Sequence, residues 1–252
     1  MQLNGIEFSE EPKKLSAYYS APSQNIAVLE RKLLHQGFEI LAVTSIFPDS
    51  SVITITNEEL KNTNSYMATL QISVNTEDVR VQNPSYLGAA YLGEKYYYGM
   101  FYDTITALEN VLGTLHSSAE KLNVKELGNY CFMYGLPKKD DILNIKADAN
   151  LLNKISTKEA KRHITYQLKL PNGTTLIGHK LNHKTNEFLN VLGEHRSSHV
   201  LPYEAMIKDN VVSIMNPKYY LALSFPELTL EQFIQIASTP DQIYRNIKKV
   251  YQ

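Results

Sequence analysis

Residues Val79–Ala89 read VRVQNPSYLGA, and this stretch decides how the rest of the chain is interpreted. An alternating run rich in valine leads directly into Asn-Pro, where asparagine can cap a helix and proline presets φ for its first turn. The arrangement returns at Val212–Ala222, which reads VSIMNPKYYLA and starts 133 positions later (79 against 212) in a chain of 252 residues. The shared pattern Asn-Pro-x-Tyr-x-x-Ala favours a duplicated unit over chance convergence on one kind of strand-to-helix turn.

Around the first copy, the periodicity predicts a β-α-β-β unit followed by a strand pair. A helix is expected between a cap at Ser23 and a stop at Gly37, with apolar side chains on one face. A second amphipathic helix is expected after an Asp103 cap, and the apolar run 129–134 indicates a buried strand. Strands are predicted at residues 15–20, 38–46, 52–56, 66–74 and 79–82, and helices at 24–36 and 85–92.

The second copy is surrounded by two predicted hairpins. The pair Asn172-Gly173 lies between alternating runs at 163–170 and 174–181, which is a strong hairpin signal. A second hairpin is expected at 200–208 and 211–215, after a short helix at 186–192. Two helices with capping-box patterns, beginning at Thr229 and Thr239, finish the chain.

These elements predict an α+β fold made of two similar β-α-β-β type halves. Antiparallel or mixed sheets are expected, with helices packed on one face. The polar stretch Lys138–Asp141 indicates the boundary between the two halves, so the expected domains are residues 1–140 and 141–252.

Composition excludes several classes of protein. Hydrophobic residues make up 43% and charged residues 20%, which is typical of a globular chain rather than a disordered one. The formal net charge is -1, and basic residues occur at most in pairs, so no nucleic-acid partner is expected. No apolar run approaches the 18 or so residues that a membrane span needs. A single cysteine excludes an intramolecular disulfide and multi-thiolate metal sites.

The turns also carry a resemblance to a family. Gly37-Phe38 after the first helix, the strand into Asn83-Pro84, and Leu201-Pro202-Tyr203 leading to Asn216-Pro217 resemble the domain-of-unknown-function family 302. The first half lacks a Leu-Pro hairpin and the second lacks a Gly-Phe pair, so about half the chain matches in scattered pieces. The resemblance implies a small α+β sandwich and no established activity, and it assigns no catalytic residue.

The first residues lack the charged and apolar regions of a signal peptide, although a chain that starts after a cleaved leader would look the same. The chain as a whole resembles uncharacterised exported bacterial proteins. That resemblance implies a periplasmic location with the leader removed, and a cytoplasmic location is the alternative.

An aromatic segment is the first candidate for ligand binding. Tyrosine and phenylalanine rings offer flat apolar area for a ring-bearing or apolar ligand, and tyrosine adds a polar tip. A half-buried edge strand and a dimer contact are the structural alternatives. The segment contains Tyr96, Tyr97, Tyr98, Phe101 and Tyr102.

Four histidines within 21 residues are the candidate metal ligands. Both His-x-x-x-His pairs have the four-residue spacing that suits a metal on a helix, but His179 falls on a predicted strand and His183, His195 and His199 fall in loops, so neither pair lies on a helix. A loop can still assemble a site, with Asn182 or Glu194 completing the ligands. Exposed loop histidines without a metal are the competing interpretation.

No catalytic motif stands out. Cys131 lies in an apolar run, which favours a core thiol, and no spacing pairs it with His116 as a nucleophile would require. The sequence identifies no cofactor and no reaction. It favours a non-enzymatic binding protein that holds a small apolar or aromatic molecule, or a protein partner, in a cleft between the halves. Metal handling by the histidine loop is the alternative, and an enzyme with an unrecognised site is third. A second copy of the chain, in a homodimer, is one candidate protein partner.

Overall fold

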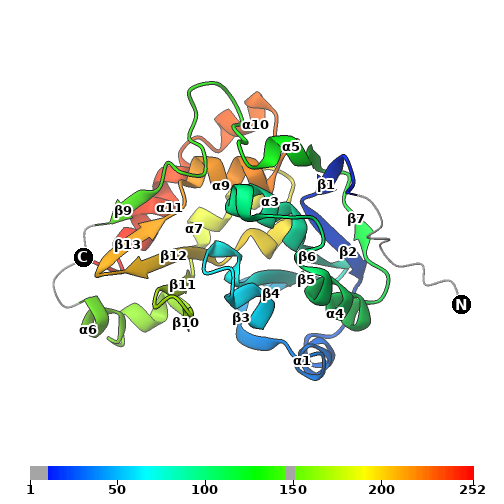
Figure 1. The fold of residues 1–252 in the computed structure, drawn as a ribbon. Helices are drawn as coiled ribbons and strands as arrows, with labels where there is room; N and C mark the ends of the chain where they lie inside the picture. Colours follow the sequence, from blue (N-terminus) through cyan, green and yellow to red (C-terminus); the bar gives the residue numbers. More distant parts are fainter. Residues whose placement is uncertain (1–10, 146–150) are drawn as a thin grey trace, which may run out of the picture.

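The computed structural model describes residues 11–145 and 151–252 and shows an α+β fold built on two large antiparallel sheets (Figure 1). We refer to residues up to 140 as the first half and to those from 141 as the second half. The first half forms a sheet in the order β3-β4-β5-β6-β2-β7, and every strand pair is antiparallel. Its strands are β2 (Tyr18–Pro22), β3 (Glu39–Phe47), β4 (Ser50–Thr56), β5 (Leu70–Val74), β6 (Asp78–Gln82) and β7 (His116–Ser117).

The second sheet has the order β10-β11-β12-β13-β9 and is also antiparallel throughout. Its strands are β9 (Leu143–Ile145), β10 (Ile164–Lys169), β11 (Thr175–His179), β12 (Tyr203–Lys208) and β13 (Val211–Ile214). Both predicted hairpins of this half are therefore confirmed. A third, two-stranded sheet pairs β1 (Lys14–Ser16) with β8 (Lys121–Asn123).

Helices fill the connections, and no helix of the described residues is long and apolar enough to cross a membrane. In the first half they are α1 (Ile26–His35), α2 (Glu58–Lys61), α3 (Pro84–Leu92), α4 (Tyr102–Leu112) and α5 (Val124–Leu127), with 3-10 turns η1 (Tyr66–Ala68) and η2 (Gly93–Lys95). In the second half they are α6 (Leu151–Ile155), α7 (His183–Asn186), α8 (Phe188–Val191), α9 (Pro217–Ser224), α10 (Leu230–Gln235) and α11 (Thr239–Lys248), with η3 (Ala160–Arg162) and η4 (His195–Val200).

The two large sheets share one strand order. The order β3-β4-β5-β6-β2 in the first sheet corresponds to β10-β11-β12-β13-β9 in the second. A register irregularity falls between Ile40 and Ala42 on β3, and another falls between Ile164 and Tyr166 on the corresponding β10. In each half Asn-Pro then follows the fourth strand of this order and caps a helix. A duplicated unit accounts for this correspondence, and common descent of the halves stays a prediction.

The first sheet has two chemically different faces. The apolar face carries residues such as Ile53, Ile72 and Val81 into a core with α1, α3 and α4. The opposite face is polar, yet its side chains are also buried, because the second half covers it. These buried polar residues are Thr54, Gln71, Ser73, Arg80 and Gln82.

The two halves cover each other through corresponding turns. The turn η4, just before β12, packs on β4, β5 and β6 of the first sheet. Its counterpart η1, just before β5, reaches the second sheet, where the Tyr66 hydroxyl donates to the Ser213 carbonyl oxygen at 2.9 Å. The corresponding strands β3 and β10 also lie in contact (Figure 1).

Several local predictions are wrong, each for a physical reason. Residues 129–134 form turns and bends rather than a buried strand, because no neighbouring strand pairs with them in the described chain. Asn25, not Ser23, caps α1. The helix α4 begins at Tyr102, so Asp103 lies inside its first turn, where its charge suits the helix dipole. Residues 66–68 form η1 rather than strand.

At the C-terminal end, Thr239 is the first residue of α11, behind Ser238, which makes no side-chain cap bond. The capping box of Thr229 with Gln232 is confirmed.

The two Asn-Pro corners provide a matched test of packing. Asn83 is buried, accepts from two backbone amides of α3, and donates through Nδ2 to the Ser16 carbonyl oxygen at 2.8 Å. Asn216 is half-buried and accepts from one amide, that of Lys218. We expect Asn83→Ala to lower the free energy of unfolding by about 2–3 kcal/mol and Asn216→Ala by about 1 kcal/mol. Denaturant unfolding of both variants measures this, and equal losses would contradict it.

Candidate functional site

The predicted aromatic ligand wall is a turn between η2 and α4. Phe101 is fully buried and caps α4, and its ring lies where a β-carbon on Gly88 would be. Tyr96 is half-buried, whereas Tyr97 and Tyr102 are 65% and 51% exposed. Tyr98 is half-buried. These five side chains thus divide between core and surface, and none of them lines the pockets described below, so their ligand-binding role stays a prediction.

The four histidines are dispersed over different environments. His179 on β11 is buried, and its Nε2 lies 2.8 Å from the Tyr251 hydroxyl. His183 is exposed beside Glu187, and His195 is half-buried in η4. His199 is buried, with its ring 4.8 Å from that of Tyr18. Among the described residues no group of three or more His, Cys, Asp or Glu side chains is placed to hold a metal ion.

Burial also sets the protonation of two of these histidines. It lowers the pKa of His179 to about 4 and, together with the Arg80 charge, that of His199 to about 3. Both imidazoles are therefore neutral at pH 7. His199 packs against Tyr18 of the first half, whereas His179 packs against Tyr251 within the second half. The prediction that His183, His195 and His199 lie in loops is wrong, because His183 begins α7 and the other two lie in η4, which packs on the first sheet and buries His199.

Cys131 is half-buried rather than part of a core strand. Its thiol lies 2.8 Å from the Met133 carbonyl oxygen and 3.2 Å from that of Leu136, so it holds a turn together.

A buried cation joins the halves. The Arg80 guanidinium on β6 donates through Nη1 to the Ser197 hydroxyl of η4 at 2.7 Å and through Nε to Asp78 at 3.0 Å. Glu194, just before η4, lies 3.5 Å from the same guanidinium. The ring of Tyr18 lies beneath the guanidinium, with its centroid 5.0 Å from the Arg80 Cζ atom. A buried charge requires such partners, so this cluster fixes how η4 is seated.

Next to this cluster lies a cavity of about 180 Å³ that we call the junction pocket. Its first-half wall is Glu120, in the short connection between β7 and β8, and its other walls come from the second half. Three carboxylates and three apolar side chains share the lining. The residues of the junction pocket are Glu120, Leu192, Glu194, Phe225, Glu227, Leu228 and Gln232.

Glu120 is the unusual member of the junction pocket. Its Oε1 accepts from the Tyr18 hydroxyl at 3.3 Å, whereas its buried Oε2 has no hydrogen-bond partner among the described residues. Burial, followed by the charge of Glu194, raises the pKa of Glu120 to about 7, with a further contribution from Glu227. The Tyr18 hydroxyl and the Arg80 charge oppose the shift. Glu120 therefore exchanges its proton near neutral pH, and a cation in the pocket would favour its charged form.

A second carboxyl with a raised pKa lies elsewhere between the halves. Glu204 on β12 is half-buried and accepts from the Tyr166 and Thr69 hydroxyls and from the Gln71 side-chain amide. Burial raises its pKa to about 7 even though two of these hydrogen bonds favour the charged form. No pocket described here reaches it, so Glu204 belongs to the packing between the sheets.

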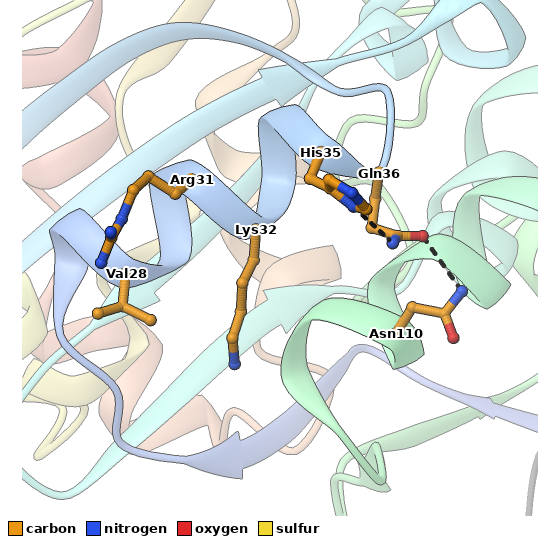
Figure 2. Close-up of a pocket in the computed structure, with 6 residues that line it drawn as sticks. All are labelled: Val28, Arg31, Lys32, His35, Gln36 and Asn110. Atoms are coloured by element: carbon orange, nitrogen blue, oxygen red, sulfur yellow. Dashed lines mark hydrogen bonds between the residues drawn. The ribbon is translucent and has the colours of Figure 1, made fainter.

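A larger cavity of about 400 Å³ lies on the outer side of α1 and α4 and carries basic residues (Figure 2). Its cations are engaged with nearby groups. Lys32 donates to the Val111 carbonyl oxygen near the end of α4, at 3.3 Å, and to Gln24. His35 lies in the last turn of α1, and Asn110 donates to Gln36 at 3.2 Å. Positive side chains at two helix C-termini complement the helix dipoles, so this cavity is the weaker candidate for a ligand site.

Comparisons of the chain with family models, with curated proteins and with solved structures found no match. The resemblance to the domain-of-unknown-function family 302 therefore stays a prediction. The functional assignment must come from the geometry of the chain itself.

No sequence pattern indicated a functional role for Glu120. Glu120 lies in a three-residue connection between two very short strands, with no motif around it. The pocket depends on residues more than 70 positions apart, and a single sequence offers no signal that brings them together.

The raised pKa of Glu204 makes a prediction about stability. The folded protein keeps a proton on Glu204 that the unfolded chain releases above pH 4.5, so this group's stabilising contribution is full below pH 4.5 and is lost as the pH rises to about 7. Between pH 5.5 and pH 8 we expect the free energy of unfolding to fall by about 2 kcal/mol. This fall of about 2 kcal/mol is the share of Glu204, and Glu120, whose pKa is also raised to about 7, contributes a similar share. Glu204→Gln therefore removes about half of the total fall, whereas Glu94→Gln on the surface keeps all of it. Denaturant midpoints at pH 5.5 and pH 8 measure this fall in the free energy of unfolding. A fall in Glu204→Gln as large as in the unchanged protein would refute the assignment.

Proposed function

We propose that this protein binds a small organic cation with an apolar body in the junction pocket. The observation that carries the proposal is Glu120, whose Oε2 is buried without a hydrogen-bond partner in the described part of the chain and whose side chain lines a cavity together with Glu194 and Glu227. A protonated amine or a guanidinium supplies the hydrogen-bond donor and the positive charge that this atom lacks. The proposal makes the chain a binding protein rather than an enzyme, because no nucleophile with a paired base lines the pocket.

The walls of the pocket specify the rest of the ligand. Leu192, Phe225 and Leu228 are buried side chains that offer apolar surface, and Phe225 is fixed by an edge-on contact with the Phe188 ring at 6.5 Å. An alkyl or aryl group packs on such a surface. The three carboxylates do not form a metal-ligand group in the described chain, which favours a cation whose charge is spread over several atoms.

The position of the pocket suggests how binding is sensed. Glu120 belongs to the first half, and the other lining residues belong to the second half. Because Glu194 also contacts Arg80 and Ser197, a ligand at Glu194 acts on the cluster that joins the halves. A ligand that bridges Glu120 and Glu194 therefore stabilises the junction.

Phenethylamine is a suitable probe because it combines an ammonium group with a phenyl ring. Its ammonium stays protonated to about pH 9, so a change in affinity between pH 5.5 and pH 8 reports on the protein. Because the cation binds the charged form of Glu120, affinity rises as the pH passes through 7. Isothermal titration calorimetry measures this, with neutral phenethyl alcohol and anionic 3-phenylpropionate as matched compounds that bind at least about tenfold more weakly.

Variants distinguish binding in the junction pocket from binding elsewhere on the protein surface. Glu120→Gln and the exposed Glu227→Gln each weaken phenethylamine binding about five- to tenfold at pH 8, and Glu120→Gln also abolishes the pH dependence. Glu126→Gln, on the exposed side of α5, leaves the affinity for phenethylamine and its pH dependence unchanged. Equal binding of the amine and the alcohol, or a loss in Glu126→Gln of the same size, would disprove the proposal.

A further inference from the structure

The main chain of Glu120 is fixed between two sheets. On one side of the connection 118–120, β7 pairs with β2, and on the other side β8 pairs with β1. Within the connection, the Ala17 amide donates to the Glu120 carbonyl oxygen at 2.9 Å, and the Ser118 amide donates to the Tyr18 carbonyl oxygen at 3.1 Å. These bonds fix the main chain at Glu120, but they leave the torsions of its side chain undetermined.

A single hydrogen bond orients the Glu120 side chain among the described residues. The Tyr18 hydroxyl donates to Oε1 at 3.3 Å, whereas the buried Oε2 has no hydrogen-bond partner there. A glutamate side chain has several rotamers to choose from, and each additional one costs binding energy when a ligand must select it. The Tyr18 hydroxyl is therefore the contact that selects one orientation of this carboxyl.

The ring of Tyr18 is itself held in place. Its centroid lies 5.0 Å from the Arg80 Cζ atom and 4.8 Å from the centroid of the buried His199 ring. Arg80 is in turn fixed by its hydrogen bonds to Asp78 and Ser197. Because the ring is packed on both the cation and the imidazole, the hydroxyl stands at a defined point beside the junction pocket. Such support behind a binding group is what keeps its geometry precise.

Four titratable groups from four segments act on the Glu120 carboxyl. Tyr18 on β2 and Arg80 on β6 favour its charged form and lower its pKa, whereas Glu194 before η4 and Glu227 before α10 raise it. Only Tyr18 among these four makes a hydrogen bond to the carboxyl within the described chain. Orientation and charge of Glu120 therefore meet at one hydroxyl.

We propose that Tyr18 is the positioning residue of the junction pocket, and that its hydroxyl holds the Glu120 carboxyl in the orientation that receives the ammonium or guanidinium group of the ligand. This inference rests on the proposed function and deepens it. Tyr18 does not line the pocket, so it acts through Glu120 rather than by contact with the ligand. Without the hydroxyl, Glu120 loses its fixed orientation and keeps its proton to a higher pH.

The variant Tyr18→Phe tests the proposal, because it removes the hydroxyl and keeps the ring that packs on Arg80 and His199. Titration calorimetry with phenethylamine from pH 5.5 to pH 8.5 measures the affinity at each pH. In the unchanged protein the affinity rises with pH and levels off above the pKa of Glu120, which is about 7. In Tyr18→Phe we expect this midpoint to move up by about half a pH unit and the affinity at pH 7 to fall about threefold.

Matched variants separate positioning from a general effect on structure. Tyr97→Phe removes a hydroxyl from a tyrosine that is 65% exposed and lies outside the junction pocket, so it leaves affinity and midpoint unchanged. In Glu120→Gln, which has no carboxyl to orient, the addition of Tyr18→Phe causes little further loss, because the two changes act on one interaction. If Tyr18→Phe fails to fold, incorporation of 3-fluorotyrosine at position 18 supplies a more acidic donor, which moves the midpoint down instead of up.

Two outcomes would overturn the proposal. One is an unchanged midpoint in Tyr18→Phe. The other is a loss of affinity that is equal at every pH and persists in full in Glu120→Gln, which would make Tyr18 a structural residue only.

Failure of the proposed function gives a different result, since phenethylamine then does not bind even to the unchanged protein. The carboxyl ¹³C chemical shift of Glu120, titrated without a ligand, tests Tyr18 in that case. A midpoint that rises in Tyr18→Phe supports the positioning of Glu120 by Tyr18, and a midpoint that does not move refutes it.

Discussion

The buried polar face of the first sheet is the constraint on which the arrangement of the halves depends. Thr54, Gln71, Ser73, Arg80 and Gln82 project from one side of β4, β5 and β6, and all are enclosed. Polar groups removed from water must find partners within the protein. Thr54 and Gln82 find partners within the first sheet, both at Gln71. The second half supplies the Ser197 hydroxyl to Arg80, the Glu204 carboxyl to Gln71 and the Arg196 carbonyl oxygen to Ser73. The position of the second half, and with it the junction pocket, follows from this requirement.

Local signals predicted much of the fold. The Asn-Gly hairpin, the two Asn-Pro corners and the Thr229 capping box depend on neighbouring residues only, and each is present. The α+β class followed from them. Errors arose where tertiary context decides: residues 129–134 have the composition of a strand but no strand to pair with, and a histidine-rich segment that looked like an exposed loop became the buried η4.

The candidate sites were harder to predict for the same reason. Alternation along β5 and β6 is typical of a sheet with one face in water, so nothing in the sequence indicated that a second half covers it. Glu120 acquires its raised pKa from burial and from Glu194, a residue of the other half. Catalytic and metal motifs are local patterns, whereas these pockets are properties of packing.

The polar face of the first sheet has a consequence for synthesis of the chain. The first half leaves the ribosome before the second, and during that interval the face that will later be covered meets water. An apolar face in the same position would expose an aggregation-prone hydrophobic surface to other nascent chains. The arginine, glutamine, serine and threonine side chains of this face are instead well hydrated until the second half is synthesised. These side chains therefore lose their water only when the second half, with η4, folds over them. This order of events protects the growing polypeptide from aggregation.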